Sequence, residues 1–317
     1  MTLETVRAAR KRIEKEIIET PLVLSEACSA QAGIPVYLKM ENLQRTGAFK
    51  VRGALNKVLS LTPELRDRGL VCASSGNHGL GVAHASSRFG AHCVVVLPED
   101  ANPYKVSRLE ELGAEIVKHG TTSDARQERV NEFVRERGYT QIHPFSDPEV
   151  IAGQGTIGLE IVEDLRHADE VYVPIGGGGL ISGIATAIKE QSPRTRIFGV
   201  EPEHSNAMSE ALRHGTPSAL PGVQTIADGL AARITEELNL SIVQRYVDDV
   251  FLVSDGDILA ATVFLLERAR ILVEPSGAAS FAGLLANEKR SGNAVAVVSG
   301  GNVSLQQLQA LRRTHSA

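Results

Sequence analysis

Short apolar runs alternate with longer amphipathic segments along most of the chain. Several runs, such as Val94–Leu97, are apolar at every position rather than at every second one. Continuous apolar runs are typical of parallel strands that are buried on both faces. We therefore predict strands at Val36–Met40, Leu70–Ala73, His92–Leu97, Glu115–Val117, Val171–Pro174, Arg196–Glu201, Val250–Val253 and Ala294–Ser299.

The segments between these runs have apolar residues at helical spacing. They predict helices at Glu4–Glu19, Gly53–Leu61, Gly79–Phe89, Tyr104–Leu112, Ser123–Arg137, Val150–Asp164, Leu180–Gln191 and Ile258–Ala269. Strands that alternate with helices imply open α/β sheets with right-handed crossovers. Such sheets bind ligands at the carboxyl ends of their strands, but the architecture alone does not name a function.

Composition narrows the class of protein. The chain has 317 residues, and its 33 Lys and Arg against 38 Asp and Glu give a net charge of −5, without the basic surplus of nucleic-acid binders. No apolar run approaches the roughly 20 residues of a membrane span. The first 20 residues are charged and lack the apolar core of an export signal. Three cysteines without close spacing fit a reducing compartment. We expect a cytoplasmic protein that acts on a small molecule, with neither nucleic acid nor membrane as partner.

Four glycines, Gly176 to Gly179, follow the predicted strand Val171–Pro174 and precede a predicted helix. Glycines let the backbone approach a ligand closely, and the N–H groups at the start of a helix carry partial positive charge. Together they would form an anion cup that suits a phosphate monoester. The alternative is a tight strand-to-helix turn, for which one or two glycines suffice.

A second group of small residues, Ser74 to Gly79, stands at the next strand-to-helix turn. Its N–H groups could hold a carboxylate, Asn77 could donate to a phenolate-type oxygen, and the Ser75 hydroxyl could transfer a proton. The alternative for Ser75 and Asn77 is helix N-capping, which both residue types do well. We expect His78 to have a structural role at the helix start.

Two further motifs bear single candidate groups. Lys50 ends the segment Glu41–Lys50 and stands at the start of a predicted helix, where a cation is unusual. Partial burial there lowers a lysine pKa and favours imine chemistry, whereas the alternative is an ordinary surface lysine. Ser299 begins the motif Ser299–Asn302, and its hydroxyl could bond a ring nitrogen or simply belong to a turn.

These four motifs, in this order, resemble the serine/threonine dehydratase family of pyridoxal-phosphate (PLP) enzymes. The resemblance extends to Ile151–Thr156, Ile226–Gly229 and Glu274–Gly277 and covers nearly the whole chain. It implies the α/β fold of the fold-type II, tryptophan synthase beta-like enzymes, with two open, twisted, mainly parallel sheets flanked by helices. A large PLP-binding domain would comprise residues 1–68 and 147–317, and a small mobile domain, residues 69–146, would grip the substrate.

The resemblance also implies a role for each candidate residue. Lys50 would bind PLP, pyridoxal 5'-phosphate, as an imine and then act as the catalytic base. Phe49 would pack beside the ring, Asn77 would bond its 3-oxygen, and Ser299 would face its nitrogen. The phosphate would lie on Gly176, Gly177, Gly178, Gly179 and the amide of Leu180. The substrate carboxylate would lie on Ser74, Ser75, Gly76, Asn77 and His78.

The reaction that the resemblance implies is an α,β-elimination. A β-hydroxy-L-amino acid, threonine or serine, would yield a 2-keto acid and ammonia. The alternatives are a threo-3-hydroxyaspartate ammonia-lyase, with an arginine such as Arg52 on the second carboxylate, another specialised hydroxy-amino-acid dehydratase, and a serine racemase with Ser75 as second base. A catalytically silent PLP-binding protein and a nucleotide-binding module are further possibilities, although the chain has no Walker A motif.

Three smaller expectations come from the same resemblance. Racemase-like members bind a divalent cation through a Glu and an Asp six residues later. Glu201 matches the first ligand, but Ala207 stands at the second position, so we expect no tight metal site and keep Glu201 as its only candidate ligand. Family members are commonly homodimers or homotetramers. Because no regulatory domain follows the last strand, we expect a role in amino-acid catabolism.

Overall fold

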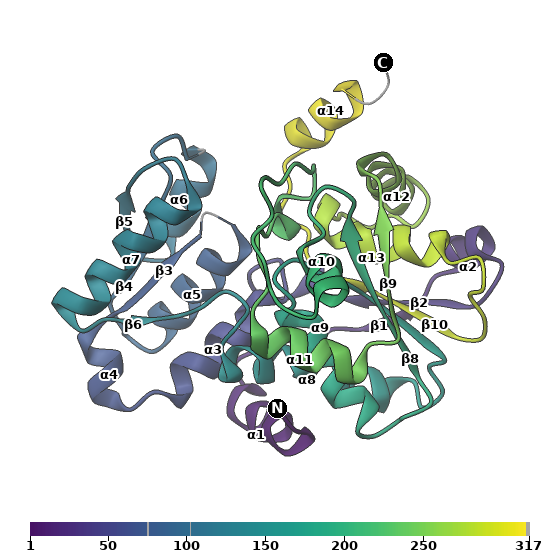
Figure 1. Ribbon diagram of the computed structural model, residues 1–317, viewed down its shortest axis with the longest axis horizontal. Coiled ribbons are helices and arrows are strands. Elements are labelled where there is room, and N and C mark those ends of the chain that lie inside the picture. The colour runs from purple at the N-terminus through teal and green to yellow at the C-terminus, as the bar shows by residue number, and fades with distance from the viewer. Residues whose placement is uncertain (75, 102, 315–317) are drawn as a thin grey trace.

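The computed structural model describes residues 1–74, 76–101 and 103–314. They form two separate sheets, each with helices on both faces, and Figure 1 shows the smaller sheet with β3 to β6 at the left and the larger at the right. A helix, α14 (Leu305–Thr314), projects from the larger unit at the carboxyl end of the chain. No helix in the described ranges is long and apolar enough to cross a membrane.

The larger sheet has the strand order β1-β2-β10-β7-β8-β9. Its strands are β1 (Leu22–Leu24), β2 (Val36–Met40), β7 (Glu170–Pro174), β8 (Arg196–Pro202), β9 (Asp249–Val253) and β10 (Ala294–Val298). All neighbours pair in parallel except β1 with β2. Alternate residues of β10 enter two different apolar clusters, which explains why this strand is apolar at every position.

Helices cover both faces of this sheet. One face packs against α2 (Glu26–Ala32), α12 (Asp255–Glu267) and α13 (Pro275–Ala286). The other packs against α8 (Pro148–Asp164), α9 (Gly179–Lys189), α10 (Ala207–His214) and α11 (Glu237–Tyr246), while α1 (Leu3–Ile13) lies on α8. The prediction of a mainly parallel α/β fold is confirmed.

The smaller sheet is entirely parallel, with the order β5-β4-β3-β6. Its strands are β3 (Leu70–Ala73), β4 (Cys93–Leu97), β5 (Glu115–Lys118) and β6 (Thr140–Gln141), accompanied by α4 (Pro63–Arg68), α5 (Asn77–Arg88), α6 (Pro103–Glu111) and α7 (Ser123–Arg137). The strands lie inside the range 69–146 that we predict for a small domain. The division into a fixed and a mobile domain stays a prediction.

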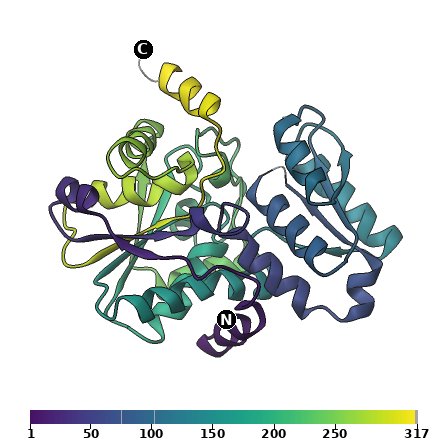
Figure 2. The same cartoon turned by 180° about the vertical axis from the view of Figure 1, so that it is seen from behind.

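Helix α3 (Lys50–Ser60) lies between the two sheets in both views (Figures 1 and 2). Its apolar residues enter the core of the smaller unit, and its opposite side packs on α8. A G-x-G-x-x-G pattern at 153–158 lies inside α8, where a Cβ on Gly153 would come within 2.6 Å of the Arg52 carbonyl oxygen. These glycines therefore serve helix packing rather than phosphate binding. The short helices η1 (Glu41–Leu43) and η2 (Asp228–Leu230) complete the fold.

The structure corrects several predicted boundaries. The helix predicted at Glu4–Glu19 ends at Ile13, because the N–H of Glu16 donates to the Ile13 carbonyl oxygen in a tight turn and the N–H of Ile18 donates to Oε1 of Gln44 instead of to a carbonyl four residues back. Helix α3 begins three residues earlier than predicted, at Lys50, and α5 begins two residues earlier, at Asn77.

Candidate active site

Three helices begin with a residue of a predicted site motif. Lys50 opens α3, Asn77 opens α5 and Gly179 opens α9. The N-terminus of each helix carries unpaired N–H groups and partial positive charge. Contacts through Pro144 and Phe145 link the first and third of these helices, because the Pro144 carbonyl contacts Lys50 and a Cβ on Gly179 would lie 2.7 Å from the Phe145 carbonyl oxygen.

Lys50 is partly buried, and its amine is held by a backbone carbonyl. Its Nζ donates to the Pro144 carbonyl oxygen at 2.6 Å and lies 5.1 Å from the centre of the Phe49 ring. Burial lowers the pKa of Lys50 to about 8. Burial, followed by the charge of Lys50, also lowers the pKa of His78 to about 3 and that of His143 to about 4, so both imidazoles are neutral at pH 7. The site thus holds a lysine that is readily available as a neutral amine.

We expect the lowered pKa of Lys50 to govern cofactor loading. The neutral amine is the nucleophile, so the rate of imine formation with added PLP should rise with pH and level off above about pH 8–9. An ordinary lysine would show a rate that keeps rising towards its pKa of about 10.4. The measurement is the growth of visible absorbance in cofactor-free protein across pH 6.5–10.5, and a midpoint near 10 would contradict this environment for Lys50.

The glycine loop presents unpaired backbone N–H groups. Gly178 is the N-cap of α9, with a φ of +95° that disfavours any side chain. In the described part of the chain, the amides of residues 176–180 donate to no acceptor, although residues 177–180 are buried. Buried N–H groups without a partner are rare in native structures. At the positive end of a helix they form an anion site that fits a phosphate group.

The motif at α5 forms a second row of backbone donors. The N–H of Gly76 bonds the Ser74 hydroxyl at 3.2 Å, and His78 bonds the Ile142 carbonyl oxygen through Nε2 at 2.8 Å. The imidazole of His78 is thus bonded to the smaller sheet, so His78 can contribute to the helix start only through its backbone N–H. The amides of residues 77–79 have no acceptor among the residues described. Ser75, the predicted second base, lies outside the described residues.

Ser299 is joined to the lysine helix through the backbone. Its carbonyl oxygen accepts from the N–H of Phe49 at 3.1 Å, and a bridge pairs Ala48 with Gly300. The buried Ser299 hydroxyl donates to the Ser276 carbonyl oxygen at 3.3 Å. The structure therefore brings Phe49, Lys50 and Ser299 together, as the motifs predict, and leaves their roles to be tested.

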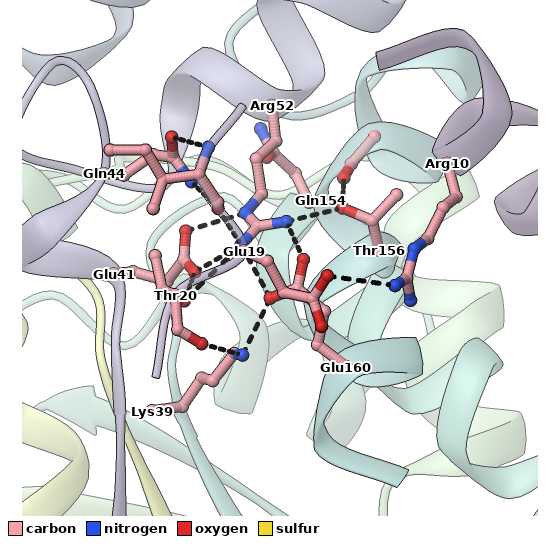
Figure 3. A network of polar contacts seen from close by, with 12 residues as sticks. Arg10, Glu19, Thr20, Lys39, Glu41, Gln44, Arg52, Gln154, Thr156 and Glu160 are labelled. Carbon is pink, nitrogen blue, oxygen red and sulfur yellow. Dashed lines mark hydrogen bonds and ion pairs between the residues drawn. The ribbon is translucent and has the colours of Figure 1, made fainter. Parts of the chain in front are cut away.

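Arg52 does not bind a substrate carboxylate, contrary to the alternative raised from the sequence. Its side chain is completely buried and forms bidentate ion pairs with Glu41, at 2.7 and 2.8 Å, and with Glu160, at 2.5 and 2.9 Å (Figure 3). Lys39 adds an ion pair to Glu160 at 2.7 Å. Burial opposes the charge on Arg52, but the two carboxylates outweigh it and raise its pKa. The network anchors α3 to β2 and α8.

Glu201 caps a helix. Its carboxylate accepts from the N–H groups of Met208 and Ser209 at 2.8 and 2.9 Å and from the Ser209 hydroxyl at 2.6 Å. Burial raises the pKa of Glu201 to about 7 despite these bonds. No cluster of three potential metal ligands occurs within residues 1–74, 76–101 and 103–314. We therefore assign Glu201 a structural role at the start of α10.

Three polar residues near the site were not assigned a role from the sequence. Glu274 and Asn302 contact the side chain of Asn77, and Asn302 also contacts Thr46. Thr46, Glu274 and Asn302 all belong to motifs that are visible in the sequence. Their spacing along the chain does not reveal that their polar groups meet in the folded protein.

An amine with a lowered pKa beside a cup of buried, unpaired amides suits a phosphorylated aldehyde. A family model described as "Pyridoxal-phosphate dependent enzyme" matches residues 13–300. The chain belongs to this family. Pyridoxal phosphate is therefore its cofactor, and the lysine and the glycine loop fit that group in amine and phosphate chemistry.

Relatives of this PLP-dependent enzyme match over nearly its whole length. The L-threonine ammonia-lyase of Thermotoga maritima is 41% identical over 309 residues, which cover 97% of this chain and 77% of the relative. The L-threo-3-hydroxyaspartate ammonia-lyase of Saccharomyces cerevisiae is 38% identical, with 98% of this chain and 96% of the relative covered. The structure of maize serine racemase has a TM-score of 0.94 at 35% identity and covers 99% of this chain and 98% of its own.

Proposed function

We propose that this PLP-dependent enzyme is an ammonia-lyase that converts a β-hydroxy-L-amino acid, L-threonine or L-serine, to a 2-keto acid and ammonia. The observation that carries the proposal is that the site combines Lys50, whose pKa is about 8, with a glycine loop whose buried backbone amides have no acceptor among the described residues. Relatives named as threonine ammonia-lyases support the reaction class.

Each side chain has a defined task in this proposal. Bound PLP supplies the electron sink that makes the α-hydrogen of an amino acid acidic. Lys50 would hold the cofactor and, as a neutral amine, would take the α-proton of the substrate. The amides at the start of α9 bind the phosphate, those at the start of α5 bind the substrate carboxylate, and the face of Phe49 shields the amine from water.

Ser299 tunes the reaction towards elimination. With PLP bound, the Ser299 hydroxyl would turn its one hydrogen from the Ser276 carbonyl oxygen to the ring nitrogen and, unlike a carboxylate, would not stabilise a proton on that nitrogen. A ring nitrogen without that proton would hold less charge in the ring, and Ser299 would in this way favour loss of the β-hydroxyl. Closure of the small domain, residues 69–146, over the substrate would exclude water from reactive intermediates.

A dicarboxylate substrate is the second candidate, because the yeast relative is named for L-threo-3-hydroxyaspartate. Its second carboxylate would need an arginine other than Arg52, which is already paired with two glutamates. A racemase role for Ser75 is a third candidate, in line with the similarity to maize serine racemase.

The test is a substrate panel on purified holoenzyme. It contains both enantiomers of serine and threonine and the threo and erythro forms of 3-hydroxyaspartate, with keto acid, ammonia and enantiomeric composition followed together. We expect keto acid and ammonia in equal amounts from L-threonine and L-serine. Faster release from a hydroxyaspartate would favour the second candidate, and racemisation without release the third. No change in any substrate would overturn the proposed function.

The setting of the enzyme is part of the same proposal. We infer a cytoplasmic homodimer or homotetramer, by analogy with the family. The three cysteines are free and buried, which suits a reducing compartment.

A further inference from the structure

The carboxamide of Asn77 is held at both of its ends. Its Nδ2 donates to Oε1 of Glu274 at 2.5 Å, and its Oδ1 accepts from Nδ2 of Asn302 at 2.8 Å. The same Asn302 nitrogen donates to the Thr46 carbonyl oxygen at 2.7 Å. Asn77 opens a helix of the smaller unit, whereas the other three residues belong to the larger one. Four separate motifs thus meet in a single chain of hydrogen bonds.

The polarity of this chain is fixed by chemistry. The Thr46 carbonyl oxygen can only accept, so the nitrogen of the Asn302 amide must face it. The second hydrogen of that nitrogen then requires the oxygen of Asn77 opposite it, and the Asn77 NH₂ group must face the carboxylate of Glu274. Of its two hydrogens one goes to Glu274, and the second has no acceptor in the part of the chain that the structure describes.

The two residues that hold Asn77 are themselves fixed. Glu274 is 5% exposed, and its N–H donates to the Gly300 carbonyl oxygen at 3.2 Å. A Cβ on Gly300 would lie 2.2 Å from Oε1 of Glu274, and one on Gly47 would lie 2.5 Å from Oδ1 of Asn302. Both glycines therefore leave the room that these side chains occupy.

We propose that Glu274 and Asn302 are positioning residues that lock the Asn77 carboxamide with its second N–H turned towards the 3-oxygen of the PLP ring. This inference rests on the proposed function, in which Asn77 contacts that oxygen. An asparagine amide can rotate by half a turn and present its oxygen instead, which would repel a phenolate-type oxygen. The lock removes that alternative and joins the two units across the site.

The test is a double-mutant cycle read out as the dissociation constant of PLP from cofactor-free protein. Asn302→Asp replaces the donor to Asn77 by an acceptor, so the orientation of Asn77 is lost. We expect PLP to bind about 10-fold more weakly, as befits the loss of one hydrogen bond to a charged oxygen. In an Asn77→Ala background the same substitution should change the constant less than about twofold, because Asn302 acts through Asn77.

Glu274 supplies an independent pair of variants. Glu274→Gln keeps an acceptor oxygen and should retain PLP binding, whereas Glu274→Leu should weaken it about as much as Asn302→Asp. Asn42→Ala is the matched control. Asn42 also donates one amide hydrogen bond to a backbone carbonyl, that of Leu272, but has no bond to Asn77, so its removal should leave the PLP constant unchanged.

Two results would overturn the inference. One is a loss of PLP affinity from Asn302→Asp that is as large in the Asn77→Ala background as in the parent protein. The other is an Asn77→Ala variant that binds PLP as tightly as the parent. If circular dichroism shows that Asn302→Asp does not fold, Glu274→Leu replaces it, and its effect on PLP affinity is compared between the parent protein and the Asn77→Ala variant. Failure of the proposed function can be distinguished from failure of this inference. In that case the substrate panel yields no products, but PLP titrations still give the dissociation constants of the double-mutant cycle.

Discussion

Replacing Lys50 with alanine is expected to abolish turnover together with the visible absorbance of the lysine-bound cofactor. The loss of proton transfer alone should lower kcat by about 10²–10⁴-fold, and the lost attachment point adds to this. Burial lowers the pKa of Lys50 to about 8, which makes its amine available both to bind the cofactor and to take a proton, and alanine can do neither. The measurements are the absorbance spectrum and the rate of keto-acid release at saturating substrate.

Lys57→Ala is the matched control for this variant. Lys57 lies on the same helix, two turns further along, and its Nζ pairs with Asp147 at 2.7 Å. We expect its variant to keep the visible absorbance. Multiple turnovers by the Lys50→Ala enzyme, or a visible band that survives that change, would remove Lys50 from the mechanism.

Replacing Arg52 with leucine should produce the largest loss of stability. Among the ion pairs of the described residues, the substitution leaves the buried Glu160 with Lys39 alone and removes the cation that pairs with the buried Glu41. Breaking a buried ion pair from one side costs about 3–5 kcal/mol, a large part of the roughly 5–15 kcal/mol of a whole protein. Urea unfolding of the cofactor-free protein gives the free energy of unfolding.

Two further variants show whether burial is the cause. Arg52→Lys keeps the charge but loses the bidentate geometry, so it should lie between the parent and Arg52→Leu. Arg10→Leu removes partly exposed ion pairs to Glu19 and Glu163, which should cost less than about 1 kcal/mol. Equal losses for Arg52→Leu and Arg10→Leu would show that the buried network does not stabilise the fold.

Much of this fold could be predicted from the sequence because the central strands of both sheets are buried on both faces. Every strand predicted from a continuous apolar run is present, with bounds that agree to within one residue. The strands that were missed, β1 and β6, have three and two residues and are too short to show a pattern. The helix predicted to continue to Glu19 stops at Ile13, where the chain turns and the N–H of Ile18 bonds the side chain of Gln44, a distant partner that the local pattern does not reveal.

In the candidate site, too, local features could be predicted from the sequence, whereas contacts between distant segments could not. The position of the glycines before α9 could be predicted, because a strand, a glycine run and a helix start are local features. The pairing of Arg52 with Glu41 and Glu160 could not, and Arg52 was wrongly considered for a substrate carboxylate. The contacts of Glu274 and Asn302 with Asn77 join residues more than 190 positions apart in the chain.

The most direct test of the central claim is to locate the cofactor in the protein. Borohydride reduces an imine between PLP and a lysine to a stable amine, and peptide mass spectrometry then identifies that lysine. We predict that the reduced cofactor is found on the peptide that contains Lys50 and that addition of L-threonine before the reductant protects this residue. Attachment at another lysine, or no attachment in protein that has bound PLP, would contradict the account.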